Sequence, residues 1–170
     1  MKYFAFIPLL ALAACATLSE DQCRNADWGA IGREDGANGR TPDFIEKHAK
    51  ACNQYGIAPV RAEWEKGRQA GLPLYCQPAR AWEEGADGHR LSPVCPATGL
   101  EELERANFRG LTYHRIGQDI DEAEREITRI NAEIASLAPD DPARVLLASE
   151  RARLRLEITM LRAERALYRY

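Results

Sequence analysis

Residues 28–36 read WGAIGREDG, and residues 64–72 read WEKGRQAGL. In both stretches glycines follow a tryptophan at steps of three or four residues, which places them on one face of a helix. A weaker third copy begins at Trp82. A glycine inside a helix costs about 1 kcal/mol relative to alanine, so the pattern indicates that another group must come close to each helix backbone. The residues of this Trp/Gly face are Trp28, Gly32, Gly36, Trp64, Gly67, Gly71, Trp82 and Gly85.

Two hypotheses explain the Trp/Gly face. In the first, helices pack on one another and each tryptophan covers the glycine-lined surface of a neighbour, since buried aromatic residues anchor small cores. In the second, the tryptophans line an open groove, where a small ligand or a cell-wall glycan stacks on their rings. The sequence favours packing and leaves the groove as the alternative.

Residues 1–15 are typical of the export signal of a bacterial lipoprotein. Lys2 supplies a positive charge, and residues 3–14 form an uncharged apolar run, far shorter than the roughly 20 residues of a membrane-spanning helix. The run ends in Leu12-Ala13-Ala14-Cys15, which resembles the lipobox at which such proteins are cleaved and acylated. We therefore expect a signal peptide over 1–14, and a Cys15 that carries diacylglycerol and palmitate.

The same segment predicts the location of the protein. Residues 15–22 would form the lipidated N-terminus and a short tether. Ala16 stands where an aspartate would be the usual signal for retention in the inner membrane. The expected location is therefore the cell envelope, anchored by lipid in the outer membrane and facing the periplasm. An ordinary secretory peptide is the alternative.

After Cys15 the chain holds four more cysteines, an even number that indicates two disulfides in an exported protein. They are Cys23, Cys52, Cys76 and Cys95, and three connectivities are open. A zinc site with His48 and His89 is the alternative, since His48 and Cys52 would share a helix face. No C-x-x-C pair occurs and the envelope is oxidising, so the sequence favours disulfides, with no metal and no cofactor.

The predicted order of helices favours one connectivity. Asp27 is a suitable N-cap for a helix from residue 28, and Pro42 at a first helical position predicts a second helix over 42–54. The short link at 38–40 makes these helices antiparallel neighbours and brings Cys23 close to Cys52. This favours a Cys23–Cys52 bond.

The pattern then recurs along the chain. We expect a third helix from residue 59 to about Leu72, because Pro73 disfavours helical geometry in the residue before it. A fourth helix is expected from Pro78, and the shorter loop that it begins closes with the remaining bond, between Cys76 and Cys95. These segments predict a small, disulfide-stapled helical domain over 23–117.

Four motifs of this domain resemble those of a known family. They are residues 28–36 and 64–72, quoted above, together with Tyr75-Cys76-Gln77-Pro78 and Val94-Cys95-Pro96. The set is similar to a family of bacterial envelope lipoproteins labelled as a domain of unknown function, DUF2799. The likeness covers about 23–117 and implies a lipoprotein with paired cysteines. It implies no activity.

Residues 118–170 are predicted to form an antiparallel, coiled-coil-like helical hairpin. Isoleucines and leucines recur every seven residues on either side of the sequence APDDP at 138–142, which is typical of a turn. The first arm is net acidic and the second net basic, which favours their pairing. The recurring residues are Ile120, Ile127 and Ile134 in the first arm, and Leu147, Leu154, Leu161 and Tyr168 in the second.

A second apolar stripe, formed by Leu156, Met160 and Leu167, lies outside this heptad pattern. Apolar surface of this kind is usually covered in a folded protein. We expect it either to pack on the domain at 23–117 or to bind a protein partner or a second copy of the chain.

The remaining composition narrows the class of function. Charged residues make up 29% of the chain, the net charge is −3, and no run of Lys or Arg occurs, so nucleic acid is not an expected partner. No motif of a hydrolase, a nucleotide-binding loop or a metalloprotease is present. The sequence therefore predicts a mainly α-helical, membrane-anchored envelope lipoprotein that is not an enzyme and has a structural or protein-interaction role.

Overall fold

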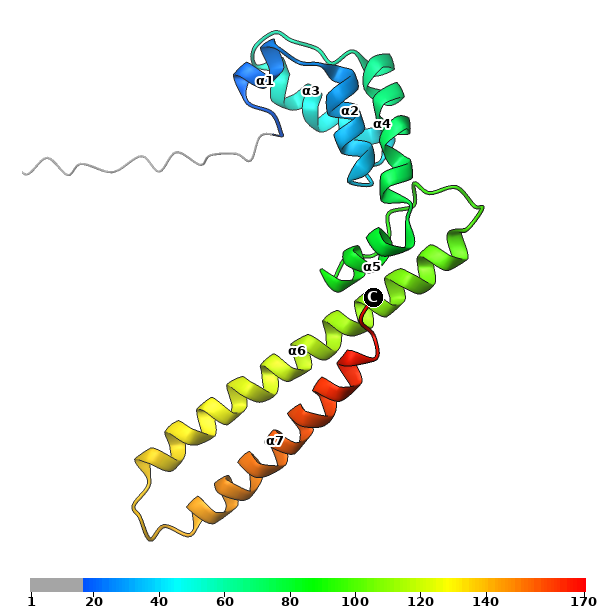
Figure 1. Ribbon diagram of the computed structural model, residues 1–170. Coiled ribbons are helices and arrows are strands. Elements are labelled where there is room, and N and C mark those ends of the chain that lie inside the picture. Colours follow the sequence, from blue (N-terminus) through cyan, green and yellow to red (C-terminus); the bar gives the residue numbers. More distant parts are fainter. Residues whose placement is uncertain (1–16) are drawn as a thin grey trace, which may run out of the picture. The chain divides into compact units, whose positions relative to one another are not determined.

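The computed structural model describes residues 17–170, and within this range the chain is helical and has no strand (Figure 1). The fold class is as predicted: a disulfide-stapled helical part followed by a long helical hairpin. The predicted signal peptide at 1–14 and the lipidation site Cys15 lie outside the described residues. The elements are α1 (Glu20–Arg24), α2 (Trp28–Ala37), the 3-10 helix η1 (Pro42–Phe44), α3 (Ile45–Asn53), α4 (Arg61–Tyr75), α5 (Pro78–Ala86), α6 (Leu100–Ser136) and α7 (Ala143–Ala166).

The described chain divides into two compact units, with the division between Gly71 and Leu72. In the first unit α2 begins where its cap predicts, since the Asp27 side chain accepts a hydrogen bond from the Ala30 amide at 2.9 Å. The expected helix over 42–54 is a 3-10 turn that continues into α3. Gly39, with a φ of 66°, supplies the left-handed residue of the turn between α2 and η1.

The segment predicted as a tether differs from the expectation. Leu18 is 7% exposed and belongs to the core of the first unit. Ser19 then caps α1, because its side chain accepts from the Gln22 amide while the Gln22 side chain accepts from the Ser19 amide. From Leu18 onward the chain is therefore part of the fold.

The third helix also ends later than the sequence predicts. It was expected to stop before Pro73, whereas α4 contains this proline and continues to Tyr75. Leu72 and Tyr75 are buried, at 9% and 1% exposure, and Cys76 directly after the helix is held by a disulfide. Burial of these side chains outweighs the hydrogen bond that Pro73 cannot make.

In the second unit α6 is one unbroken helix of 37 residues. The sequence placed a domain boundary at 117/118, and α6 runs through that position. Its N-terminal half packs on α5, and its C-terminal half packs on α7. Because Gly110 and Gly117 remain helical inside α6, the end of the predicted domain over 23–117 and the first arm of the hairpin belong to the same element.

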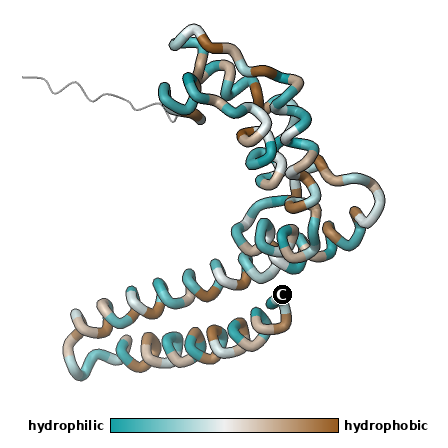
Figure 2. The backbone as a smooth tube through the Cα atoms, turned by 45° about the horizontal axis from the view of Figure 1, so that its top comes forward, coloured by the Kyte–Doolittle hydropathy of each residue, from teal (hydrophilic) through white to brown (hydrophobic). Residues whose placement is uncertain are grey.

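The hairpin core contains all the residues of the predicted heptad pattern, together with four further apolar residues, and Figure 2 shows apolar positions recurring along both arms. Arg144 of α7 stabilises the turn between the two arms. Its guanidinium donates to the carbonyls of Ile134 and Leu137 near the end of α6, at 2.6 and 3.1 Å. One ion pair joins the two arms among the described residues, between Arg162 and Glu124 at 2.7 Å. The core residues are Ile116, Ile120, Ala123, Ile127, Ile130 and Ile134 of α6, with Leu147, Leu154, Ile158, Leu161 and Tyr168 of the second arm.

Candidate functional site

The glycines of the first two motifs lie where α2 and α4 touch backbone to backbone. A Cβ atom on Gly32 would stand 2.0 Å from the Trp64 carbonyl oxygen, and one on Gly36 would stand 2.0 Å from the Arg68 carbonyl oxygen. The relation is reciprocal, because a Cβ atom on Gly67 or Gly71 of α4 would stand 2.0 or 2.1 Å from a carbonyl oxygen of α2. The four glycines therefore serve close helix packing.

The tryptophans of this unit are covered as well. Trp28 is 5% exposed and Trp64 is fully buried. The rings that the groove hypothesis needs as a stacking surface thus lie inside the core of the first unit.

The third copy of the Trp/Gly pattern makes the same kind of contact in the second unit. A Cβ on Gly85 of α5 would stand 2.2 Å from the Asn107 carbonyl oxygen, and one on Gly110 of α6 would stand 2.1 Å from the Trp82 carbonyl oxygen. Trp82 itself is half-buried, and its indole N–H donates to the carbonyl of Tyr168 at 2.8 Å. This bond joins α5 to the chain that follows α7.

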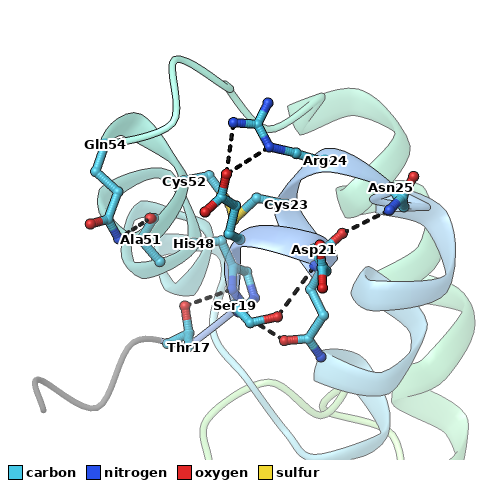
Figure 3. The surroundings of a disulfide bond; sticks show 12 residues. Thr17, Ser19, Asp21, Cys23, Arg24, Asn25, His48, Ala51, Cys52 and Gln54 are labelled. Atoms are coloured by element: carbon cyan, nitrogen blue, oxygen red, sulfur yellow. Dashed lines mark hydrogen bonds and ion pairs between the residues drawn. A yellow bond between two sulfur atoms is a disulfide. The ribbon is translucent and has the colours of Figure 1, made fainter.

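A buried polar network lies in the first unit, and the sequence reasoning missed its centre, Asp35. One carboxylate oxygen of Asp35 accepts from the Trp64 indole N–H at 2.8 Å and lies 2.8 Å from His48 Nε2. The other imidazole nitrogen, His48 Nδ1, lies 3.0 Å from the Thr17 hydroxyl (Figure 3). Asp35 and His48 are 8% and 3% exposed, so the network ties α2, α3, α4 and the segment before α1 together.

The cysteines form both favoured disulfides, Cys23–Cys52 in the first unit and Cys76–Cys95 in the second. Figure 3 shows the first of these bonds beside His48, at the meeting of α1 and α3. The four thiols that the zinc alternative requires are thus engaged in disulfides. His48 has the partners just described, and His89 is largely exposed with Glu84 3.8 Å away. Within residues 17–170 no three side chains of metal-binding type cluster.

A second unpredicted feature is the ion pair of Arg68 and Glu65. The Arg68 side chain is 3% exposed and donates to both carboxylate oxygens of Glu65, at 2.8 Å each, and to the Arg40 carbonyl at 3.0 Å. These bonds from Arg68 hold the pKa of Glu65 below its usual value. The spacing of three residues on a helix was the signal that could have found the pair.

Of the nine exposed large apolar residues that the structure describes, four lie along α7 and its C-cap on the side opposite to α6. We call this side the outer face of α7. The inner side holds Leu147, Leu154, Ile158 and Leu161. The sequence identified three members of the outer face but missed the rest, because small residues separate the large ones. Six of its seven members are apolar, and each member has another member 11 residues away. Its members are Val145, Ser149, Ala152, Leu156, Met160, Ala163 and Leu167.

The exposed fractions show that the described residues 17–170 leave the outer face uncovered. Val145 and Leu167 are 72% and 73% exposed, Leu156 is 62% exposed and Met160 is 59% exposed. Leu146, which flanks the face, is 72% exposed. A surface helix normally has a polar side toward water, so a helix with two opposite apolar sides has one side free for a partner.

Comparison with known proteins places the chain in a family. Residues 27–112 match the model of a family described as a protein of unknown function, DUF2799. The match extends over half of the 170 residues. The chain belongs to the DUF2799 family. Comparison with curated proteins and with solved structures gave no match.

The DUF2799 match covers the Trp/Gly helices and both glycine contacts. It begins at Asp27, the N-cap of α2, and ends at Thr112, inside α6. Asp35, Arg68 and the Cys76–Cys95 disulfide lie within it, whereas α7 with its outer face lies beyond it. In the described part of this DUF2799 chain, no helix has the length and apolar composition to span a membrane.

Proposed function

We propose that this protein is a lipid-anchored scaffold of the bacterial cell envelope, which binds another protein chain through the outer face of α7 and carries out no catalysis. The observation that carries the proposal is the apolar outer face itself. It extends over the length of a helix whose opposite side is already buried against α6.

The anchoring half of the proposal depends on the sequence at 12–15. A lipobox-like motif with acylation at Cys15 would hold the protein at the outer membrane, facing the periplasm. Several acyl chains on one residue give stable anchoring, where a single chain gives marginal binding. The disulfides agree with this location, because they persist in oxidising compartments.

The anchoring half is tested by fractionating cells that express the full chain or its Cys15→Ser variant. The wild type is expected in the membrane fraction with the mass of an acylated N-terminus, and the variant without that mass in the soluble fraction. Membrane association that survives Cys15→Ser would overturn the lipid anchor.

The binding half is tested by placing a photo-crosslinking amino acid at position 160 in living cells. Its matched control is position 118, an exposed glutamine of α6. We expect an adduct of defined mass from position 160 and none from position 118. No adduct from any position on the outer face would overturn the role of this face.

A further inference from the structure

We propose that the occupant of the outer face of α7 is a second copy of this chain, paired antiparallel about a two-fold axis that passes beside Leu156. The inference rests on the proposed function, in which this face is the interaction surface, and it names the partner.

The positions of the outer face are symmetric about Leu156. Ala152 and Met160 lie four residues before and after it, Ser149 and Ala163 lie seven, and Val145 and Leu167 lie eleven. The face therefore presents the same spacing when the helix direction is reversed. This is what an isologous two-fold interface requires, since residue i must meet residue j while j meets i.

The sizes of the residues also match in this register. Ala152 would face the partner's Met160, so a long side chain meets a small one. By symmetry, Met160 would face the partner's Ala152 on the other side of the two-fold axis. Ser149 would face the partner's Ala163, which lets the two helices approach closely. In a parallel pair each residue would face its own copy, so Met160 would crowd against the partner's Met160 while the alanines left gaps.

The spacing suits a long contact between nearly straight helices. An 11-residue repeat corresponds to 3.67 residues per turn, close to the 3.6 of an undistorted α-helix. Val145, Leu156 and Leu167 repeat at this distance. The outer face can thus stay against its partner over ~33 Å of helix.

The exposed apolar area extends along the whole of α7. The large residues of the outer face are 59–73% exposed from Val145 to Leu167, and an antiparallel pair about Leu156 would cover all of them. A standard interface buries ~800 Å² on each partner, so a stable pair needs contact over this full length.

The charges beside the axis are complementary. Arg153 and Glu157 lie on the same edge of the face and pair within α7 at 3.0 Å. In the proposed register Arg153 faces the partner's Thr159, and the partner's Glu157 lies on the same edge two residues, ~3 Å, nearer to the two-fold axis, within reach of the Arg153 side chain. The same relation holds between Glu157 and the partner's Arg153. Four charges of alternating sign would then surround the centre of the interface.

Cysteine crosslinking of the full chain in the periplasm tests both the pairing and its direction. Leu156→Cys places two thiols beside the two-fold axis, and we expect a covalent dimer on a non-reducing gel. Ala152→Cys alone should stay monomeric, because the two cysteines would lie ~12 Å apart along the direction of the helices. Co-expression of Ala152→Cys and Met160→Cys chains should restore a crosslinked species at twice the chain mass. Gln118→Cys on α6 is the control and should remain monomeric.

Other outcomes would overturn the inference in distinguishable ways. A dimer from Ala152→Cys alone would overturn the antiparallel direction. If every cysteine variant is monomeric while the photo-crosslinker at position 160 captures a different protein, the self-pairing is wrong and the proposed function stands. If neither experiment gives an adduct, both are wrong.

Discussion

At the scale of single residues, Asp35 connects two buried side chains of the first unit. Its carboxylate accepts the indole N–H of Trp64 and contacts His48, both of which are buried. A buried donor left without an acceptor costs about 1–3 kcal/mol, so the packing of Trp64 depends on this carboxylate. Every described buried side-chain nitrogen or oxygen has such a partner. The polar groups in this core therefore specify its arrangement.

The Arg68–Glu65 pair leads to a pH-dependent prediction. Because the pKa of Glu65 is lower in the folded protein than in the unfolded chain, the pair stabilises the fold above the unfolded pKa of about 4.5, and this contribution is lost as the pH falls through the folded pKa. Glu65→Gln should reduce the free energy of unfolding by about 1–2 kcal/mol at pH 7, allowing for the partial exposure of Glu65. The difference from wild type should shrink between pH 5 and about pH 3.

Denaturant unfolding across this pH range measures the effect. Glu63→Gln is the matched control, since Glu63 is an exposed glutamate on the same helix that makes no ion pair with the described residues. It should differ little from wild type at any pH. A loss from Glu65→Gln that stays constant down to pH 3 would contradict the ionic origin of the effect.

At the scale of elements, the contact between α2 and α4 predicts different outcomes for two glycines of one helix. The methyl group of Gly32→Ala would meet the Trp64 carbonyl, which is backbone and cannot move aside. It should lower the free energy of unfolding by at least about 2 kcal/mol, despite the better helix propensity of alanine. In Gly29→Ala the methyl group meets only the Asp27 side chain, at 3.3 Å, and stability should stay within about 1 kcal/mol of wild type.

Thermal unfolding followed by circular dichroism compares the two variants. Equal stability of Gly32→Ala and Gly29→Ala would mean that α2 and α4 are not in backbone contact.

Local signals in the sequence were sufficient to predict most helix starts and the hairpin. Asp27 and Pro78 mark helix N-termini by chemistry that acts within a few residues. The heptad of Ile120 and Ile127 reflects a single neighbour along the whole helix, so its period is regular.

The features that the sequence did not reveal depend on contacts between distant residues. The extension of α4 past Pro73 follows from burial of Tyr75, whose hydroxyl accepts from the Ser92 amide in a later loop. The role of Asp35 depends on His48 and Trp64, which lie 13 and 29 residues further along the chain. The sequence did not reveal that α6 is one continuous helix through residue 117. Its N-terminal half packs on α5 through glycine, so the apolar pattern of the helix changes near this position.

At the scale of the whole molecule, each compact unit has its own disulfide. The Cys23–Cys52 bond closes a loop over 29 residues in the first unit, and the Cys76–Cys95 bond closes one over 19 in the second. Loops of these lengths correspond to about 3–4 kcal/mol each from restriction of the unfolded chain. The glycine contacts follow the same division, α2 with α4 and α5 with α6. Each unit thus combines a close helix pair with a covalent closure.

This arrangement predicts that the effect of losing one disulfide is concentrated in its own unit. Replacing both Cys23 and Cys52 by alanine should lower the stability of α1–α3 by about 3–4 kcal/mol, because the loop is released and two buried sulfur atoms are lost. Hydrogen exchange should quicken most in residues 18–57 and least in the α6–α7 hairpin. The matched variant without Cys76 and Cys95 should show the reverse, with faster exchange in α5 and the following loop. If both variants quicken exchange equally along the whole chain, the two units unfold as one, and the disulfides stabilise the molecule globally.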